Sequence, residues 1–252
     1  MSADHPSSAA WLHERLAADG HIHSTFSDGT SDPAANLRAG IAAGLVDMVM
    51  TDHVRAGTTW LPAYVAAVDR LRLDVGIRVR VGVETKLMDT AGGLDLPAVL
   101  DGVELLLIAD HQYPTSTGPV PPALIEDALR AGRTDPGTVV WGLADSLVAA
   151  ISRLDRPAII AHPFSILPKM GLTELDIPDD ALRALASRCR ETGTAVEVNE
   201  KWACPGPLVA RALHASGVEL VAGSDAHQSE AVGRYWHVRD VLGAVATAGV
   251  AA

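Results

Sequence analysis

Short apolar runs alternate with longer amphipathic stretches along the whole chain. The runs are rich in Val, Ile, Leu and Ala and end at Gly, Pro or polar residues, which is typical of buried parallel strands. We predict seven strands, at Gly20–Ser24, Val46–Thr51, Arg78–Glu84, Val103–Ala109, Pro157–Ala161, Ala195–Asn199 and Glu219–Ser224.

The stretches between these runs carry helix signals. Asp32-Pro33 combines an N-cap residue with proline at the first helical position, and Gly44 suits the position just after a helix. We predict helices at Ala9–Ala18, Pro33–Gly44, Leu61–Val75, Pro122–Ala131, Gly137–Arg153, Asp179–Thr192, Pro205–Ser216 and Val238–Ala248. Residues 85–102, Gln112–Pro122 and Phe164–Pro178 are predicted to be loops.

This alternation of strands and helices predicts the α/β class, with a parallel sheet and right-handed crossovers. Seven such units without a break in composition favour a single domain that closes into a TIM-like β/α barrel. The alternative is an open, doubly wound sheet, although no G-x-G-x-x-G turn follows the first strand. Residues 1–18 are expected to form an N-terminal extension with a short helix, and residues 19–252 the barrel domain.

The composition limits the class of partner. With 252 residues, of which 48% are hydrophobic and only 4% aromatic, Ala, Val and Leu must build most of a large core. The net charge of −11 argues against a stable complex with nucleic acid through a broad basic surface. A small anionic substrate is compatible with this charge, because a bound metal cluster inverts the local field.

The two cysteines, Cys189 and Cys204, form no C-x-x-C pair, which argues against a zinc ribbon or a thioredoxin-like motif. We expect both to be reduced thiols. No apolar run is long enough to predict a membrane span, and the first residues lack the pattern of a signal peptide. A soluble, cytoplasmic protein without a membrane partner is therefore expected.

Metal-binding side chains gather at the ends of six of the seven predicted strands. His21 and His23 lie two residues apart, so both imidazoles project from the same face of the first strand. The carboxyl ends of the strands of a parallel barrel meet on one face, so residues far apart in the sequence converge there. The candidate metal ligands are His21, His23, Asp28, His53, Glu84, His111, His162, Asp225 and His227.

The chemistry of this set indicates a metal centre. Six of the ten histidines lie at predicted strand ends. Histidine together with aspartate and glutamate suits Zn, Mn or Fe. The candidates outnumber the three or four protein ligands of a single catalytic metal, so two or three divalent ions bridged by a carboxylate or hydroxide are expected.

The ordered motifs resemble the polymerase-and-histidinol-phosphatase (PHP) family of metal-dependent phosphoesterases. From Asp19 to Gly233 they are H-x-H followed by Asp28, T-D-H at Thr51–His53, G-V-E at Gly82–Glu84, a buried strand followed by His111, A-H-P at Ala161–Pro163 and S-D-A-H at Ser224–His227. The resemblance implies a distorted seven-stranded β/α barrel with a trinuclear metal site. It also implies three ligand sets: His21, His23, Glu84 and Asp225; then Glu84 as a bridge with His111 and His162; and finally Asp28, His53 and His227.

The family resemblance implies a phosphoric ester hydrolase but does not fix its substrate. With 252 residues and no polymerase attached, we expect a stand-alone enzyme that cleaves a small phosphomonoester, as histidinol phosphatases do. A metal-activated hydroxide would attack phosphorus in line with the leaving group, without a protein nucleophile. Asp225 and His227 are the candidate catalytic residues, because either could pass a proton to the leaving group. Histidinol phosphate and other small phosphomonoesters are equally compatible with the motifs.

Polar side chains that directly follow strands are candidates for binding the substrate phosphate. Lys201 is the first of these, because it follows the only strand that lacks a predicted ligand. The others are Arg55, Lys86, Arg234 and Asn199. Asp52 is expected to orient a histidine from behind, and the loops at 112–122 and 164–178 to act as lids.

Three other functions are compatible with the same ligand set. A nucleotide or oligonucleotide phosphodiesterase or exonuclease would use these metals, but it needs an open basic groove. An amidohydrolase-type hydrolase also uses histidines and aspartates at barrel ends, and a metal-binding domain without turnover would need nothing more. The order of the motifs favours a phosphate substrate, and the complete ligand set argues against a domain without turnover. The net acidity and the few aromatic residues near the site argue against a nucleic-acid substrate, and the oligomeric state is left open.

Overall fold

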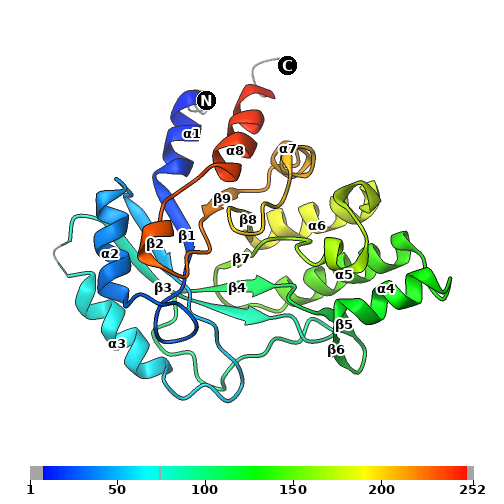
Figure 1. Ribbon diagram of the computed structural model, residues 1–252, viewed down its shortest axis with the longest axis horizontal. Helices are drawn as coiled ribbons and strands as arrows, with labels where there is room; N and C mark the ends of the chain where they lie inside the picture. The colour runs from blue at the N-terminus through cyan, green and yellow to red at the C-terminus, as the bar shows by residue number, and fades with distance from the viewer. Residues whose placement is uncertain (1–7, 74, 249–252) are drawn as a thin grey trace.

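The computed structural model describes residues 8–73 and 75–248 as one domain built on a parallel β-sheet (Figure 1). The seven strands of this sheet are hydrogen-bonded in the order β1-β2-β3-β4-β7-β8-β9. Their bounds are β1 (Ala18–Ile22), β2 (Asp47–Met50), β3 (Arg78–Lys86), β4 (Leu105–Ala109), β7 (Ala158–Ile160), β8 (Ala195–Asn199) and β9 (Leu220–Gly223). The seven predicted strands are thus confirmed, with ends that shift by no more than two residues.

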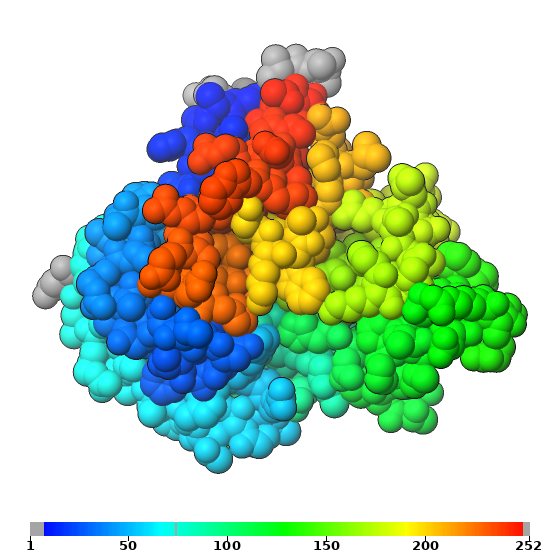
Figure 2. All heavy atoms as spheres, in the orientation of Figure 1, coloured from blue at the N-terminus to red at the C-terminus, as the bar shows by residue number. Residues whose placement is uncertain are grey.

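The sheet nearly closes on itself between its first and last strands. Ile22 forms a parallel bridge with Ala226, and the His23 N–H donates to the Ala226 carbonyl at 2.8 Å. In the space-filling view, the blue segments that follow β1 and the orange segments that follow β9 lie side by side (Figure 2). The predicted barrel is therefore confirmed in a distorted form, with irregular pairing where it closes.

Helices follow the strands and cover the outside of the barrel (Figure 1). They are α1 (Ser8–Leu16), α2 (Pro33–Ala42), α3 (Leu61–Leu71), α4 (Pro122–Arg130), α5 (Pro136–Ile151), α6 (Asp179–Thr192), α7 (Pro207–Ala215) and α8 (His237–Ala248). The predicted N-cap is confirmed, since the Asp32 side chain accepts from the Ala35 N–H. The last helix packs beside the first, so both described ends of the chain lie together. Residues 1–7 of the predicted N-terminal extension lie outside the described residues.

Two predictions of local structure were wrong. The segment Gln112–Pro122 is not a plain loop but contains the antiparallel hairpin β5 (Tyr113–Thr115) and β6 (Gly118–Val120), in which two prolines pair with each other. The helix predicted at Leu61–Val75 ends earlier, at Leu71. The Arg72 N–H closes its last turn, and the Arg72 guanidinium donates to Glu104 Oε2 at 2.8 Å. The loop Phe164–Pro178 contains short 3-10 turns at Leu167–Met170 and Glu174–Asp176.

The inside of the barrel is arranged in layers. Its middle is an apolar plug formed by inward side chains of five strands, among them Val49, Leu107, Ile159 and Val221. Strand β3 continues this layer toward the carboxyl end with Glu84 and Lys86, whose side chains share a face because they are two residues apart. The plug therefore places the polar ends of the strands at one mouth of the barrel.

Both cysteines are buried and free. Burial raises the pKa of the Cys189 thiol to about 12, so this side chain packs as an uncharged thiol. The expectation of reduced cysteines agrees with this arrangement. Within residues 8–73 and 75–248, no helix is both long and apolar enough to cross a lipid bilayer.

Candidate metal centre

Glu84 is the centre of the polar cluster at the carboxyl mouth of the barrel. Its carboxylate is 1% exposed, and both of its oxygens face imidazole nitrogens. Oε2 lies 3.3 Å from the Nε2 atoms of both His21 and His23 and 2.9 Å from His53 Nδ1. Oε1 lies 3.2 Å from His111 Nε2 and 3.0 Å from His162 Nε2. One carboxylate therefore touches histidines that follow four different strands.

The first strand presents two fully buried imidazoles to this carboxylate. His21 Nε2 and His23 Nε2 lie 3.0 Å apart, and Asp225 Oδ1 lies 3.3 Å from His23 Nε2. Burial lowers the pKa of His23 to about 4, so its ring is neutral near pH 7 and has a lone pair to offer a metal.

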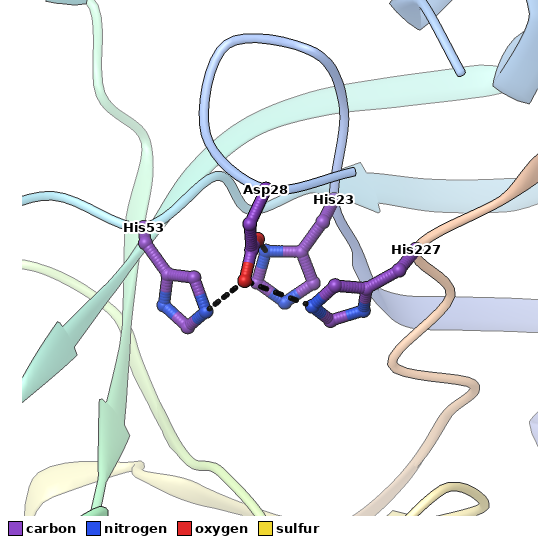
Figure 3. A group of neighbouring side chains, drawn as sticks. All are labelled: His23, Asp28, His53 and His227. Carbon is purple, nitrogen blue, oxygen red and sulfur yellow. Dashed lines mark ion pairs between the residues drawn. The ribbon is translucent and has the colours of Figure 1, made fainter. Parts of the chain in front are cut away.

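Asp28 joins three histidines on the open side of the cluster (Figure 3). Its Oδ2 lies 3.5 Å from His53 Nε2 and 3.3 Å from His227 Nε2, and its Oδ1 lies 3.8 Å from His23 Nδ1. Gly29 allows this tight loop, since a Cβ there would approach the His23 carbonyl oxygen to 2.8 Å. Asp28 is the most exposed of the predicted ligands, with 54% of its side chain accessible.

The remaining predicted ligands complete the ring around Glu84. The His162 ring lies against the His111 ring, with centroids 5.2 Å apart. Asp225 Oδ1 lies 3.3 Å from His227 Nδ1 and 3.5 Å from Lys201 Nζ. The structure thus brings together all nine side chains that were predicted as metal ligands.

The electrostatics of the cluster suit bound cations. Burial alone would raise the pKa of the Glu84 carboxyl, but the positive charge of His21 and hydrogen bonds from His111 and His162 hold it well below its usual value. Two buried atoms at the centre, Glu84 Oε2 and His23 Nδ1, make no well-oriented hydrogen bond within the described part of the chain. Buried polar atoms without partners are unusual and are satisfied by metal ligation.

The distances also fit metal coordination. With metal–ligand bonds of about 2.0–2.2 Å, neighbouring ligands of a tetrahedral ion lie roughly 3.4 Å apart. The nitrogen–oxygen separations around Glu84 are between 2.9 and 3.3 Å. Groups whose ligand atoms all lie within 4.8 Å of one another are His21, His23 and Glu84; His53, Glu84 and His111; and His23, Asp28, His53 and His227. These overlapping groups resemble the predicted sets with three differences: His23 also belongs with Asp28, His53 takes the place of His162 beside Glu84 and His111, and Asp225 belongs to none of them.

The predicted substrate-binding residues occupy different positions. Arg55 and Lys86 line a cavity of about 280 Å³ that also contains His53, Glu84 and His111. Lys86 Nζ donates to Gln112 Oε1 at 3.0 Å. A cation is therefore held beside the histidine cluster by a residue of the segment after β4.

Lys201 lies on the other side of the cluster. Its Nζ is 3.1 Å from His227 Nδ1, and 46% of its side chain is exposed. Trp202, the next residue, places its ring 5.6 Å from the ring of His162 and 4.2 Å from Lys169 Nζ. The loop that contains Lys169 thus covers this side of the site.

Three polar residues make contacts that differ from the roles predicted for them. Arg234 is exposed and lines a separate surface pocket with Trp236 and Arg239. Asn199 is fully buried, and its Oδ1 accepts from the Trp202 N–H at 2.8 Å, which fixes the turn after β8. The prediction that Asp52 orients a histidine was wrong, because its carboxylate accepts hydrogen bonds from the N–H and hydroxyl groups of Ser24 and Ser27.

Glu197 is a buried member of the cluster that was not predicted from the sequence. This glutamate lies in the middle of β8, where 1% of its surface is exposed, and its Oε1 is 2.9 Å from His21 Nδ1. The available signal was a single charge in the apolar strand A-V-E-V-N, two residues before Asn199 and therefore on the same inward face. A charged residue at such a position needs a partner inside the barrel.

Comparisons with known proteins agree with this geometry. Residues 19–119 match the model of the PHP domain. This segment contains six of the nine predicted ligands. Over these residues the chain resembles the PHP family. It is similar to the "Probable histidinol-phosphatase" of Deinococcus radiodurans, with 27% identity over 91% of this chain and 95% of the relative. It is also 27% identical to the "Probable phosphatase" of Acetivibrio thermocellus, over 91% of this chain and 84% of the relative.

The PHP fold is supported by a solved structure as well. A Listeria monocytogenes protein provisionally named as a histidinol phosphatase superposes with a TM-score of 0.63. The alignment covers 86% of this chain and 97% of that protein, at 14% identity, so the likeness concerns the fold alone. The predicted family and barrel are confirmed, and the prediction of a hydrolase of this family agrees with the names of the relatives.

Proposed function

We propose that this PHP protein is a metal-dependent phosphoesterase that hydrolyses a small phosphomonoester at a di- or trinuclear site. The observation that carries the proposal is the convergence of nine candidate ligand side chains at one mouth of the barrel, where five of the histidines contact the single carboxylate of Glu84. Relatives of matching length are named as phosphatases, one of them as a histidinol phosphatase. Small phosphomonoesters of that kind are therefore the proposed substrate class.

The ligand side chains would hold the metal ions in overlapping groups. His21, His23, Asp225 and the Oε2 atom of Glu84 would bind on one side of the bridging carboxylate. His111, His162 and the Oε1 atom would bind on the other, with Asp28, His53 and His227 at the open side. Zn, Mn or Fe suits this mixture of imidazole and carboxylate. Bound divalent ions supply an activated water and neutralise the charge of the phosphoryl oxygens.

The protein's own residues would position the phosphate and manage protons. Lys201, Arg55 and Lys86 lie on opposite sides of the cluster, so cations would reach a phosphoryl group from two directions. Asp225 and His227 are the candidates for protonating the leaving alkoxide, because both lie beside Lys201 at the edge of the cluster. The cavity of about 280 Å³ beside Arg55 and Lys86 suits a small leaving group.

A comparison of substrate classes tests this proposal. Protein purified without chelator would be assayed for phosphate release from a panel of phosphomonoesters, with a phosphodiester and an amide as the alternatives. We expect turnover of monoesters, with metal found on the same sample. Faster cleavage of the diester would favour the phosphodiesterase function instead. Cleavage of the amide alone would favour an amidohydrolase-type reaction and contradict the proposal.

A further inference from the structure

Among the carboxylates in the described part of the barrel that are not themselves proposed ligands, Glu197 is the one that contacts two of those ligands. Its Oε1 lies 2.9 Å from His21 Nδ1, and its Oε2 accepts the backbone N–H of His162 at 2.7 Å. These ligands belong to β1 and to the end of β7, whereas Glu197 belongs to β8. A single side chain thus links residues from three strands behind the cluster.

The contact with His21 determines how that ring presents itself. A carboxylate offers only acceptor atoms, so the hydrogen of this bond belongs to His21 Nδ1. The other ring nitrogen, Nε2, then faces inward, 3.3 Å from Glu84 Oε2 and 3.0 Å from His23 Nε2. A histidine held this way by a carboxylate has a fixed orientation and is a better metal ligand.

The contact with His162 acts on the backbone. His162 has a φ of 29°, outside the conformations that residues with a side chain normally adopt. Its N–H is bound by Glu197, and its ring places Nε2 at 3.0 Å from Glu84 Oε1. Such backbone geometry persists only where the surroundings hold it, and Glu197 supplies one of those contacts.

The packing leaves this carboxylate little freedom. Gly223 of β9 lies against it, and a Cβ at that position would collide with Glu197 Oε1. The His21 and His162 rings stack beside it, with centroids 5.8 Å apart and planes 22° apart. The space behind the two histidines is therefore shaped to hold a glutamate side chain in one place.

We propose that Glu197 is a positioning residue of the metal centre, which aims His21 through its ring and His162 through its backbone at the ions that Glu84 would bridge. This inference rests on the proposed function, since it assumes that the cluster binds metal. Removal of carboxylates that hold metal-bound histidines typically lowers metal affinity about 10- to 100-fold.

The test compares the full-length wild type with Glu197→Gln, which keeps the size of the side chain but replaces one acceptor by an amide. Zinc affinity would be measured by competition with a chromophoric chelator, and the His21 Nδ1–H resonance would be observed by NMR in ¹⁵N-histidine-labelled, metal-free protein. We expect zinc affinity to fall about 10- to 100-fold and the protected resonance to disappear. Unchanged affinity would overturn the proposal, and so would a resonance that stays intact in Glu197→Met, which removes both acceptor oxygens.

Two further variants separate positioning from general stability. Asp19→Asn alters another carboxylate that is 1% exposed, but Asp19 accepts the backbone N–H of His21 and not its ring N–H, so the His21 resonance should persist. Gly223→Ala displaces Glu197 without removing it and should reproduce both changes, which decides the matter if Glu197→Gln does not fold. Wild type without bound zinc would refute the proposed function, while the resonance would still show whether Glu197 holds the His21 ring.

Discussion

At the residue scale, Glu84 joins the two halves of the proposed metal site. Each of its oxygens faces a different group of imidazoles, so its loss affects every group at once. We predict that Glu84→Gln, which keeps the volume but loses the charge, retains less than about one tenth of the metal and of any metal-dependent turnover. Metal analysis of the purified protein checks this. Glu219→Gln, at the opposite mouth of the barrel, is the matched control.

Kinetics can distinguish two of the residues that were predicted to bind substrate, Lys201 and Arg234. Lys201 lies 3.1 Å from His227, whereas Arg234 lines a different pocket. A charge-assisted hydrogen bond to the substrate contributes about 1.5–3 kcal/mol, so Lys201→Ala should lower kcat/KM by about 10- to 100-fold, mainly through KM, with metal content unchanged. Arg234→Ala should leave the kinetics as they are. A KM unaffected by the loss of Lys201 would remove it from the site.

The ligands were predictable because each lies in a short motif at the end of an apolar strand. His21 and His23, for example, need only the alternation of strand side chains to be placed together. Glu197 was missed because its role depends on which side chains face it from β1 and β7, and the sequence of β8 does not contain that information. Asp52 was misplaced for the same reason, since Ser24 and Ser27 reach it only after the loop at Asp28 has folded.

At the scale of elements, Glu200 connects the end of β8 to the last helix. Its carboxylate accepts the N–H groups of Trp236, His237 and Val238. These groups lie at the start of α8, where backbone N–H groups have no partner inside the helix. We predict that Glu200→Ala lowers the free energy of unfolding by about 1–2 kcal/mol, as loss of a helix cap does, measured by urea denaturation. Loss of activity without loss of stability would contradict this structural role. Asp32→Ala removes the N-cap side chain of α2 and provides the comparison for the loss of unfolding free energy.

Element boundaries follow from the chain where local signals are strong. The helix Asp179–Thr192 was predicted with its observed bounds, because two acidic residues begin its first turn and Gly193 ends it in a left-handed conformation. The hairpin at Tyr113–Val120 was not predicted, because its prolines and threonines are equally typical of a loop. Its pairing depends instead on contacts with α5, to which the Tyr113 hydroxyl donates at the Val139 carbonyl.

At the scale of the whole molecule, the metal centre lies where the barrel closes and should therefore contribute to its stability. Ligands on both of the strands that meet there, such as His23 and Asp225, would be joined through the ions. A metal present at about a thousand times its Kd stabilises the folded state by about 4 kcal/mol, and for a chain of this size Tm changes by about 2–4 °C per kcal/mol. We predict that chelation lowers Tm by about 10 °C and that added metal restores it. A Tm indifferent to chelator would show that no metal is bound.

The number of strands and their parallel order followed from the sequence, since strand and helix patterns alternate seven times. The closure of the barrel did not, because the contact of Ile22 with Ala226 joins positions at opposite ends of the chain and has no local pattern. The contacts between the segments of β1 and β9 decided between the barrel and an open, doubly wound sheet.

The most direct test of the account is a titration of metal-free protein with Mn²⁺ or Zn²⁺, in which bound metal and hydrolysis of a phosphomonoester are followed on the same sample. We predict that hydrolysis is absent from the metal-free protein, appears as two or three ions bind per chain, and is lost in Glu84→Gln. Full metal binding without release of phosphate from any monoester would contradict the proposed function. Hydrolysis that is unaffected by removal of metal would contradict the proposed role of the nine ligands.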